Sequence, residues 1–421
     1  MKYPGRDILS AVYGEKAGEA LARYRHLGEQ FEKHFGPGDP SWFSAPGRTE
    51  IVGNHTDHNG GKILAASISM DTICAARKRD DGIIRIVSEG YREPVVVDLQ
   101  ALRQVPKYQG SVSLVAGMAE GAEKMGYRTG GFEAYVTTEV ISSAGLSSSA
   151  SYEMLLCTVL NHFYNGDRIP AEDYARIGQY AENHWWGKAS GLMDQMACAI
   201  GGTILLDFSD GVHVEKADFT FADIDCDLLI INTGKGHADL SAEYSAIPEE
   251  MKAVAHLLGA EQLAETNGSS LVRALPEIRE TLRDDRALLR AMHFYAENQR
   301  VERAAAAIRE GRKKTILSII KESGNSSWKW LQNCYVDSRP GEQPIPLLLA
   351  LAEAYFANFG RGVCRVHGGG FAGVIMCVVP KDMTEAFTAF MEPFAGAENI
   401  CRMSIRQTGA VCLESGETDE E

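Results

Sequence analysis

A strand followed by a serine-rich turn and a helix is the feature that most constrains this chain. Residues 145–151 read Gly-Leu-Ser-Ser-Ser-Ala-Ser. Before them, Gly131 to Val140 alternates with a period of two, which predicts a half-buried strand. After them, Tyr152 to Tyr164 is mostly apolar without Gly or Pro, which predicts a helix. Free backbone N–H groups and the positive end of a helix dipole face outward at such a turn, which suits a phosphate.

The three serines of this turn have two interpretations. Hydroxyl oxygens can bind a hard cation such as Mg²⁺, which would accompany a phosphate. Serine is also a preferred N-cap, and the same residues would serve a buried helix with no ligand at all. The turn alone does not separate these interpretations.

Composition excludes several classes of protein. The formal net charge of −15 argues against non-specific binding to nucleic acid or to an anionic membrane. The N-terminus lacks the apolar core of a signal peptide, and no run of about 18 apolar residues occurs. Nine dispersed cysteines without Cys-x-x-Cys spacing are typical of reduced thiols. We therefore expect a cytoplasmic protein that binds neither nucleic acid nor membrane.

The chain of 421 residues is too long for one ordinary core and indicates two or three domains. A composition change near residues 211–220 suggests domains at 1–215 and 216–413, followed by an acidic tail, 414–421, that we expect to be disordered. The remaining periodicity predicts strands at 42–51, 62–69, 72–78, 83–88, 94–97, 203–208, 226–232, 361–366 and 372–379, a closing segment at 404–413, and helices at 15–35, 111–125 and through most of 240–358.

A polar loop near the N-terminus is the second candidate site. Asn54, His55, Asp57 and His58 lie close together between two predicted strands. They offer several directional donors and acceptors, which suit sugar hydroxyls. A metal site and a solvated hairpin tip are the alternatives, because His and Asp are also metal ligands.

A glycine-rich loop near the C-terminus is the third candidate site. Residues 366–373 read Val-His-Gly-Gly-Gly-Phe-Ala-Gly between two predicted strands. Such glycines let the backbone approach a phosphate, although a tight structural turn looks the same. The chain has no P-loop, no protein-kinase motif set and no Rossmann glycine fingerprint, so any nucleotide must bind in a different cradle.

Together and in this order, the three motifs resemble those of the galactokinases, in the galacto-, homoserine, mevalonate and phosphomevalonate (GHMP) kinase superfamily. The resemblance extends to Ala181-Glu-Asn, to Gly191-Leu-Met-Asp-Gln195 and to Tyr244, and it spans nearly the whole chain. It implies an α+β, two-domain GHMP kinase fold, with an N-terminal domain like domain 2 of ribosomal protein S5 and a ferredoxin-like C-terminal domain. ATP and a sugar would meet between them.

The resemblance also implies roles for individual residues. Asp194 matches the carboxylate that accepts the proton of the anomeric hydroxyl, and Arg48 matches the arginine beside it. Ser149 and Glu182 match the ligands of a Mg²⁺ ion that bridges the β- and γ-phosphates. Gly368 to Gly370 would shape the cleft. The matched nucleotide-binding residues are Gly145, Leu146, Ser147, Ser148, Ser149 and Ser88, and the matched sugar-binding residues are Asn54, His55, Asp57, Gly191 and Tyr244.

Some positions depart from the family pattern. Galactokinases usually carry Glu, which contacts the sugar 6-hydroxyl, where this chain has Asn54. An uncharged amide there predicts tolerance of a modified C6, unless Asn54 faces the loop backbone instead. The other departures are His58 for Tyr, residues 141–144 for Pro-x-Gly-x, His367 for a small hydroxyl residue and Ala372 for Gly.

Three functions are therefore compatible with the sequence. The first is an ATP-dependent kinase acting on the C1 hydroxyl of galactose or a galactose-like sugar, with ATP and Mg²⁺ bound. The second is a kinase for a C6-modified relative such as galacturonate. The third is an inactive sugar and ATP sensor, but known fungal sensors have lost residues of the serine turn, which is complete here. The oligomeric state is not determined by the sequence, although a monomer is favoured.

Overall fold

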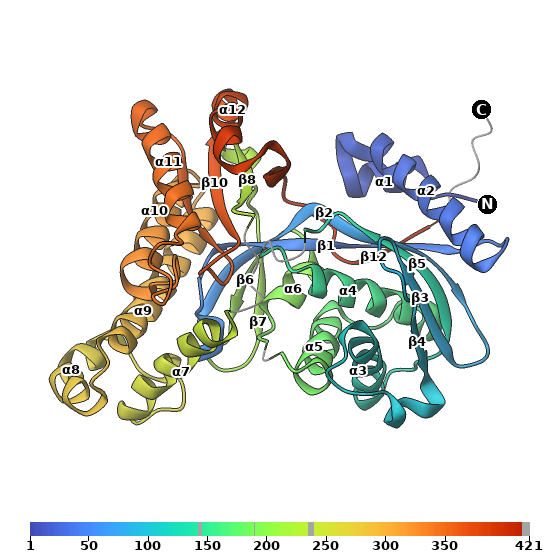
Figure 1. Cartoon of the computed structure of the whole chain (residues 1–421), viewed down its shortest axis with the longest axis horizontal. Coiled ribbons are helices and arrows are strands. Elements are labelled where there is room, and N and C mark those ends of the chain that lie inside the picture. Colours follow the sequence, from blue (N-terminus) through green and yellow to red (C-terminus); the bar gives the residue numbers. More distant parts are fainter. Residues whose placement is uncertain (142–144, 189, 235–239, 415–421) are drawn as a thin grey trace.

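Two long strands organise the larger sheet of the computed structural model, which describes residues 1–141, 145–188, 190–234 and 240–414 (Figure 1). β1 (Ser41–Val52) and β2 (Lys62–Lys78) run antiparallel, with Ser41 opposite Ala76 and Val52 opposite Leu64. The register shifts between Pro46 and Arg48, where β2 bulges: its residues 68–70 lie opposite the single β1 residue Gly47. Such a bulge re-aims the side chain that follows it.

The larger sheet has eight strands within the described ranges, in the order β12-β1-β2-β5-β3-β4, and β6 and β7 extend it from β2. All neighbouring pairs are antiparallel except β3 with β5. The further strands are β3 (Ile83–Ser88), β4 (Val95–Asp98), β5 (Phe132–Thr138), β6 (Thr203–Asp207), β7 (His213–Ala217) and β12 (Val411–Leu413).

β2 is one continuous strand, so the prediction of two strands at 62–69 and 72–78 is wrong. The polar residues that suggested a break are compensated by distant segments. Asp71 is fully buried and pairs with Arg23 at 2.8 Å and with Arg406 at 2.9 Å. Burial by itself raises the pKa of Asp71, but the two guanidinium groups outweigh it and hold the pKa below its ordinary value. A charged residue can therefore remain inside a central strand.

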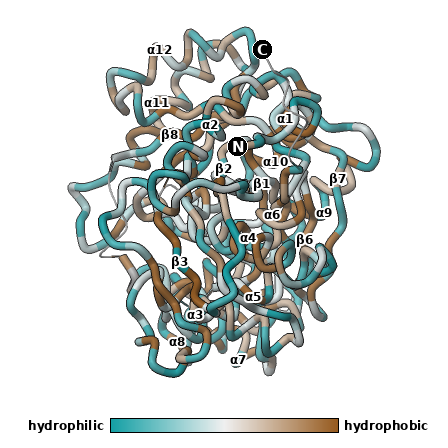
Figure 2. The backbone as a smooth tube through the Cα atoms, turned by 90° about the vertical axis from the view of Figure 1, so that its right-hand side faces the viewer, coloured by the Kyte–Doolittle hydropathy of each residue, from teal (hydrophilic) through white to brown (hydrophobic). Residues whose placement is uncertain are grey.

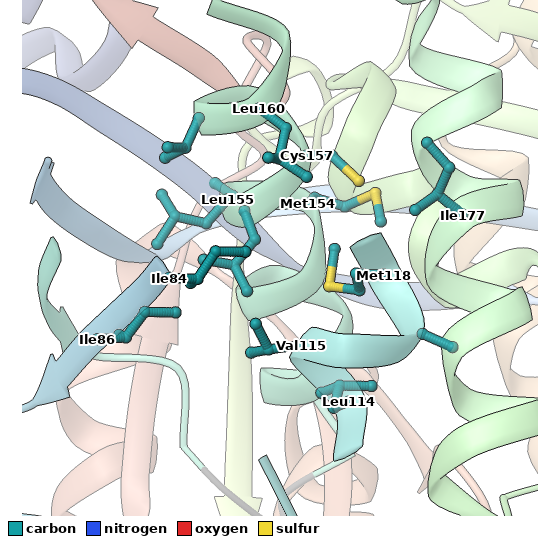
Figure 3. Packing of buried hydrophobic residues seen from close by; sticks show 14 of the residues in the cluster. Ile84, Ile86, Leu114, Val115, Met118, Met154, Leu155, Cys157, Leu160 and Ile177 are labelled. Carbon is teal, nitrogen blue, oxygen red and sulfur yellow. The ribbon is translucent and has the colours of Figure 1, made fainter. Parts of the chain in front are cut away.

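Helices cover both faces of this sheet (Figure 1). α1 (Arg6–Tyr13), which the sequence did not predict, and α2 (Ala17–Phe35) lie on one face. The other face carries α3 (Gly110–Lys124), α4 (Ser148–Leu160), α5 (Ala171–Ala181) and α6 (Met193–Ile200). Figure 3 shows Ile84 and Ile86 of β3 facing Val115 and Met118 of α3 and Leu155 of α4. In Figure 2 the stretch at β3 is hydrophobic, in line with its place in this core.

A second, four-stranded antiparallel sheet is formed within the described ranges in the order β11-β8-β10-β9. The helical region predicted at 240–358 packs beside it, and α12 was not predicted. The strands are β8 (Cys226–Asn232), β9 (Val363–His367), β10 (Val374–Pro380) and β11 (Ile400–Met403). The helices are α7 (Ser241–Leu257), α8 (Gly268–Leu282), α9 (Asp285–Arg309), α10 (Thr315–Ser326), α11 (Pro344–Phe359) and α12 (Thr384–Ala395).

One hydrophobic cluster joins the two sheets. Leu64 and Ile68 of β2 and Leu146, just before α4, pack in the same cluster as Ile230 of β8 and Met376 of β10. The serine turn is thereby anchored where the two sheets meet. The domain boundary at residues 215 and 216 stays a prediction, and residues 415–421 of the predicted tail lie outside the described ranges.

Among the described residues, no helix combines the length and the apolar character needed to cross a lipid bilayer.

We expect Asp71→Ala to destabilise the protein strongly, because it leaves Arg23 and Arg406 without their buried carboxylate. Removing one partner of a buried ion pair typically costs about 3–5 kcal/mol. Glu215→Ala, which breaks the exposed pair with Arg309, is the matched control and should cost at most about 1 kcal/mol. Urea unfolding monitored by circular dichroism measures the free energy of unfolding of both variants. Equal effects of the two substitutions would contradict this role of Asp71.

Candidate active site

A buried ion pair forms the centre of the site. Arg48 of β1, opposite Ser67 where the β1–β2 register shifts, places Nε and Nη2 each 2.7 Å from Oδ1 of Asp194, in the first turn of α6. The backbone N–H of Arg48 donates to the Leu146 carbonyl at 3.1 Å. Gly47 permits this approach, because a Cβ there would lie 2.8 Å from the Leu146 oxygen. The two predicted catalytic residues are therefore in direct contact.

The surroundings of Asp194 keep its carboxylate ionised. Burial acts to raise its pKa, but Arg48, Lys188 and a hydrogen bond from the Ser147 hydroxyl outweigh burial and lower it below the ordinary value. The Asp194 side chain retains 25% exposure, whereas that of Arg48 retains 7%. An ionised, reachable carboxylate held by a fixed cation is suited to accept a proton.

The serine turn lies directly beside this pair. Nη1 of Arg48 donates to the Gly145 carbonyl, and Ser147 adopts a left-handed conformation with φ 56°. α4 begins at Ser148, four residues before the predicted start at Tyr152. Its first backbone N–H groups therefore lie next to the ion pair, which is the arrangement expected for a phosphate site.

Two of the predicted nucleotide-binding residues lie differently from the rest. The Leu146 side chain is fully buried in the cluster that joins the sheets, so only its backbone faces the site. Ser88 ends β3 opposite Val136 of β5, and the described residues show no hydrogen bond from its side chain to the serine turn. The role of Ser88 in nucleotide binding stays a prediction.

The predicted metal ligands are also in contact. Ser149 Oγ donates to Glu182 Oε1 at 3.1 Å, and Lys188 Nζ lies 2.8 Å from the same oxygen. Glu182 is fully buried at the end of α5. Their oxygens fit a hard cation that takes its other ligands from phosphates and water. Nowhere in the described residues do three or more His, Cys, Asp or Glu side chains gather in a way that could hold a metal ion.

Sequence analysis missed the residues that support Glu182. Gln195 donates at 3.1 Å both to Glu182 Oε2 and to Glu153 Oε2. Glu153 is fully buried in α4, and burial together with the nearby Glu182 carboxyl raises its pKa well above the ordinary value. Burial therefore favours the neutral form of the Glu153 carboxyl. The available signal was a lone carboxylate in an apolar helix, between Tyr152 and Met154.

Four of the predicted sugar-binding residues lie in the polar loop or next to it and the glycine-rich loop. Nε2 of His55 donates to the Gly369 carbonyl at 2.9 Å, and the Tyr244 hydroxyl donates to the Gly370 carbonyl at 2.9 Å. Asp57 packs against Gly191, where any Cβ would collide with its carboxylate. The polar loop therefore faces the segment that leads into α6.

His55 keeps a buried nitrogen for a ligand. Burial, and secondarily His58, lowers the pKa of His55 to about 3, so its ring is neutral. Because Nε2 carries the proton that Gly369 accepts, Nδ1 is a bare acceptor, and it has no partner among the described residues. A hydroxyl group would satisfy it.

Comparisons with known proteins decide the family. Residues 29–78 match the galactokinase galactose-binding signature, and residues 113–202 match the GHMP kinase N-terminal domain. A galactokinase of Exiguobacterium sibiricum is 30% identical over 86% of this chain and 90% of its own length. A galactokinase of Ligilactobacillus salivarius is 30% identical over 86% of this chain and 91% of its own length. This chain belongs to the galactokinase family.

Solved structures agree with this assignment. A galactokinase of Lactococcus lactis, in complex with galactose, superposes with a TM-score of 0.78 and 26% identity, over 92% of this chain and 99% of the other. A mevalonate kinase of Methanococcus jannaschii superposes with a TM-score of 0.62 at 13% identity, which shows a shared fold. The predicted α+β GHMP kinase fold is therefore confirmed.

Asn54, the main departure from other galactokinases, lies inside the protein. Its side chain amide donates to the Gly368 carbonyl at 2.9 Å and to Glu50 at 3.3 Å. Its amide oxygen accepts from Asn333 at 3.0 Å and from Ser327 at 3.4 Å. With 1% exposure and all four hydrogen bonds made within the protein, this amide contacts the Gly368 carbonyl of the glycine-rich loop and three side chains, rather than the backbone of its own loop. A direct contact between Asn54 and a sugar stays a prediction and would require these bonds to rearrange.

The glycines that follow are needed for the turn itself. Gly370 has φ 83°, and a Cβ there would collide with the Asn333 backbone oxygen. Phe371 N donates to the same oxygen at 2.5 Å, and Ala372 N donates to Gly370 O at 2.6 Å. These glycines therefore form a tight turn, which is compatible with a cleft-shaping role, and the approach of a phosphate to this loop stays a prediction. Residues 142–144, which belong to the departure at 141–144 before the serine turn, lie outside the described ranges.

We expect Asn54→Asp to lower the thermal midpoint at neutral pH and to recover part of it in acid. The introduced carboxylate would face Glu50 and the Gly368 carbonyl, to which it cannot donate, although Asn333 and Ser327 could still donate to it. The repulsion raises the folded-state pKa of the new group, so its penalty should shrink as pH falls from about 7.5 to about 5.

Asn267→Asp is the matched control for that experiment. Asn267 is the exposed N-cap of α8, where its side chain accepts from Ser270 N and where aspartate caps equally well. Its thermal midpoint should follow that of the wild type at both pH values. A pH-independent loss in Asn54→Asp would contradict the proposed carboxylate repulsion.

Proposed function

We propose that this protein transfers the γ-phosphate of ATP to the anomeric C1 hydroxyl of galactose. The observation that carries this proposal is the contact of Arg48 and Asp194 at the N-terminus of α4, beside the polar loop. The galactokinase matches, including one solved with galactose, support the choice of sugar. ATP and Mg²⁺ are the proposed second substrate and cofactor.

The ion pair performs the proton transfer in this proposal. Asp194 accepts the proton of the C1 hydroxyl as its oxygen attacks the γ-phosphorus. Arg48 keeps the carboxylate ionised and stabilises negative charge on the transferring group. Because guanidinium does not deprotonate at working pH, its contribution is electrostatic. The phosphates lie at the first N–H groups of α4.

Ser149 and Glu182 would hold the metal ion. When bound, Mg²⁺ neutralises charge on the phosphates during transfer. Gln195 fixes the second oxygen of Glu182, and Lys188 limits repulsion around the carboxylate. This support explains how a fully buried glutamate can stay oriented towards a cation.

The sugar contacts follow from the polar loop. Nδ1 of His55, which lacks a partner among the described residues, accepts a ring hydroxyl, and Asp57 binds adjacent hydroxyls. The C6-modified sugars are not proposed, because the Asn54 amide is already fully hydrogen-bonded. The sensor is not proposed, because the base, its arginine and both metal ligands are all in place. Monomeric state and cytoplasmic location stay predictions.

We expect Asp194→Asn to reduce turnover by about 10²- to 10⁴-fold, since a neutral amide cannot act as the base. Asp218→Asn, at a fully exposed carboxylate, is the matched control and should retain wild-type turnover. ADP release with galactose, measured by a coupled assay, gives the rates. If Asp194→Asn kept more than a tenth of the activity, Asp194 would not be the base.

We expect Gly191→Ala to weaken galactose binding about 10-fold or more while nucleotide binding stays within about 2-fold, because the added Cβ displaces the Asp57 carboxylate. Gly18→Ala is the control, since a Cβ at this helical position meets nothing within 4 Å. Calorimetric titration with galactose and with ADP separates the two effects. Unchanged galactose affinity would remove Asp57 from the sugar site.

A further inference from the structure

His367 is a buried residue of the site to which the proposed mechanism gives no task. It ends β9, directly before the glycine-rich loop, and is 1% exposed. Where other galactokinases usually have a small hydroxyl residue, this chain places a full imidazole ring. The ring lies next to β1 and so beside Arg48, because its Nε2 contacts Thr49 and Glu50.

The hydrogen bonds of His367 determine which ring nitrogen carries the proton. The backbone N–H of Glu50, which can only donate, points at Nε2 at 3.4 Å. The Thr49 hydroxyl lies 2.9 Å from the same nitrogen and 4.0 Å from the Met376 Sδ, so its single proton can go to either, and the Glu50 N–H is the contact that fixes the direction. Nε2 is therefore an acceptor, and the proton of the neutral ring is on Nδ1. Burial, assisted by the charges of Arg48 and Arg365, holds the pKa of His367 well below its ordinary value, which keeps the ring neutral.

The Nδ1–H group has no acceptor among the described residues. A buried donor without a partner costs about 1–3 kcal/mol, and native proteins rarely leave one unexplained. The residues around it indicate the missing acceptor. A Cβ on Gly145, the first residue of the serine turn, would lie 3.2 Å from Nδ1.

Glycines of the serine turn and of the glycine-rich loop lie close together beside Nδ1 of His367. A Cβ on Gly368 would lie 3.2 Å from the Cα of Gly145, so the two backbones approach each other above the imidazole. The Gly145 carbonyl is already bound by Arg48. Nδ1–H therefore faces the junction of the serine turn, the ion pair and the glycine-rich loop. The phosphoryl groups proposed to bind at the serine turn offer only acceptor oxygens and would adjoin this junction.

We propose that His367 donates a hydrogen bond from Nδ1 to an oxygen of the transferred phosphoryl group of a bound nucleoside triphosphate. This inference rests on the proposed kinase function and adds a phosphate-contacting residue to it. The donor is neutral, so it can orient the γ-phosphate without competing with Asp194 for Arg48. The small hydroxyl residue that is usual at this position has a shorter side chain, so it would reach the same phosphoryl oxygen over a different distance.

Two amide substitutions separate this role from packing. In His367→Asn the amide occupies the position of Nδ1 and keeps a donor there, but it loses the contacts with Thr49 and Glu50. In His367→Gln the amide reaches the position of Nε2 and keeps those contacts, but it loses the Nδ1 donor. Binding of a non-hydrolysable ATP analogue and of ADP is measured by calorimetry, and the thermal midpoint is measured for each variant.

We expect His367→Gln to bind the triphosphate analogue about 10-fold more weakly or worse, with ADP within about 2-fold of the wild type. His367→Asn should bind the analogue within about 3-fold of the wild type, even if its thermal midpoint is the lower of the two. Equal weakening of ADP and the analogue, unchanged binding in His367→Gln, or affinities that follow the thermal midpoints would overturn the proposal.

The wild-type protein distinguishes this test from a test of the kinase function. If the wild type binds the triphosphate analogue and the variants behave as expected, the proposal stands whichever sugar is phosphorylated. If the wild type binds the analogue but the variants do not differ, only the role of His367 fails. If the wild type binds neither nucleotide, the kinase proposal fails, and the role of His367 fails with it.

Discussion

The buried contact between Arg48 and Asp194 is the interaction on which the rest of the site depends. A guanidinium with 7% exposure requires a charged partner, because an unpaired buried charge is very costly. The register shift between β1 and β2 and the missing side chain at Gly47 let Arg48 approach the start of α6. The same arginine binds the Gly145 carbonyl, so the proposed base and the proposed phosphate-binding turn are positioned by one side chain. A change in either partner would therefore disturb both halves of the reaction.

Local sequence patterns predicted the helices and strands that are stabilised mainly by residues close to one another in the sequence. Alternation located β5, and apolar spacing located α4, although the helix starts earlier because small serines carry no apolar signal. The pairing of Arg48 with Asp194 spans 146 positions and followed only from the family resemblance. The continuity of β2 was missed because Asp71 is neutralised by arginines from opposite ends of the chain. A buried charge that is neutralised by residues far away in the sequence gives no signal in the local sequence pattern.

Three of the departures from the family pattern lie at the glycine-rich loop. Asn54 donates to the Gly368 carbonyl, His367 precedes that residue, and Ala372 N donates to Gly370 O. A glutamate at position 54 could not donate to Gly368 and would face Glu50. The amide therefore holds the glycine-rich loop in a way that a carboxylate cannot. Substitutions that look like separate changes in a sugar pocket are one change in how this loop is held.

Two imidazoles with opposite hydrogen-bonding states result from this arrangement. His55 gives its Nε2 proton to the Gly369 carbonyl and leaves Nδ1 as an acceptor, whereas His367 accepts at Nε2 and leaves Nδ1 as a donor. In both rings a main-chain group selects the tautomer, and burial keeps the ring neutral. A sugar hydroxyl can donate and a phosphoryl oxygen can only accept, so the two free nitrogens match the two substrates. The fold, rather than the pH, thus determines the hydrogen-bonding state of each ring, and the proposed contacts of His55 with the sugar and of His367 with the phosphoryl group use these two states.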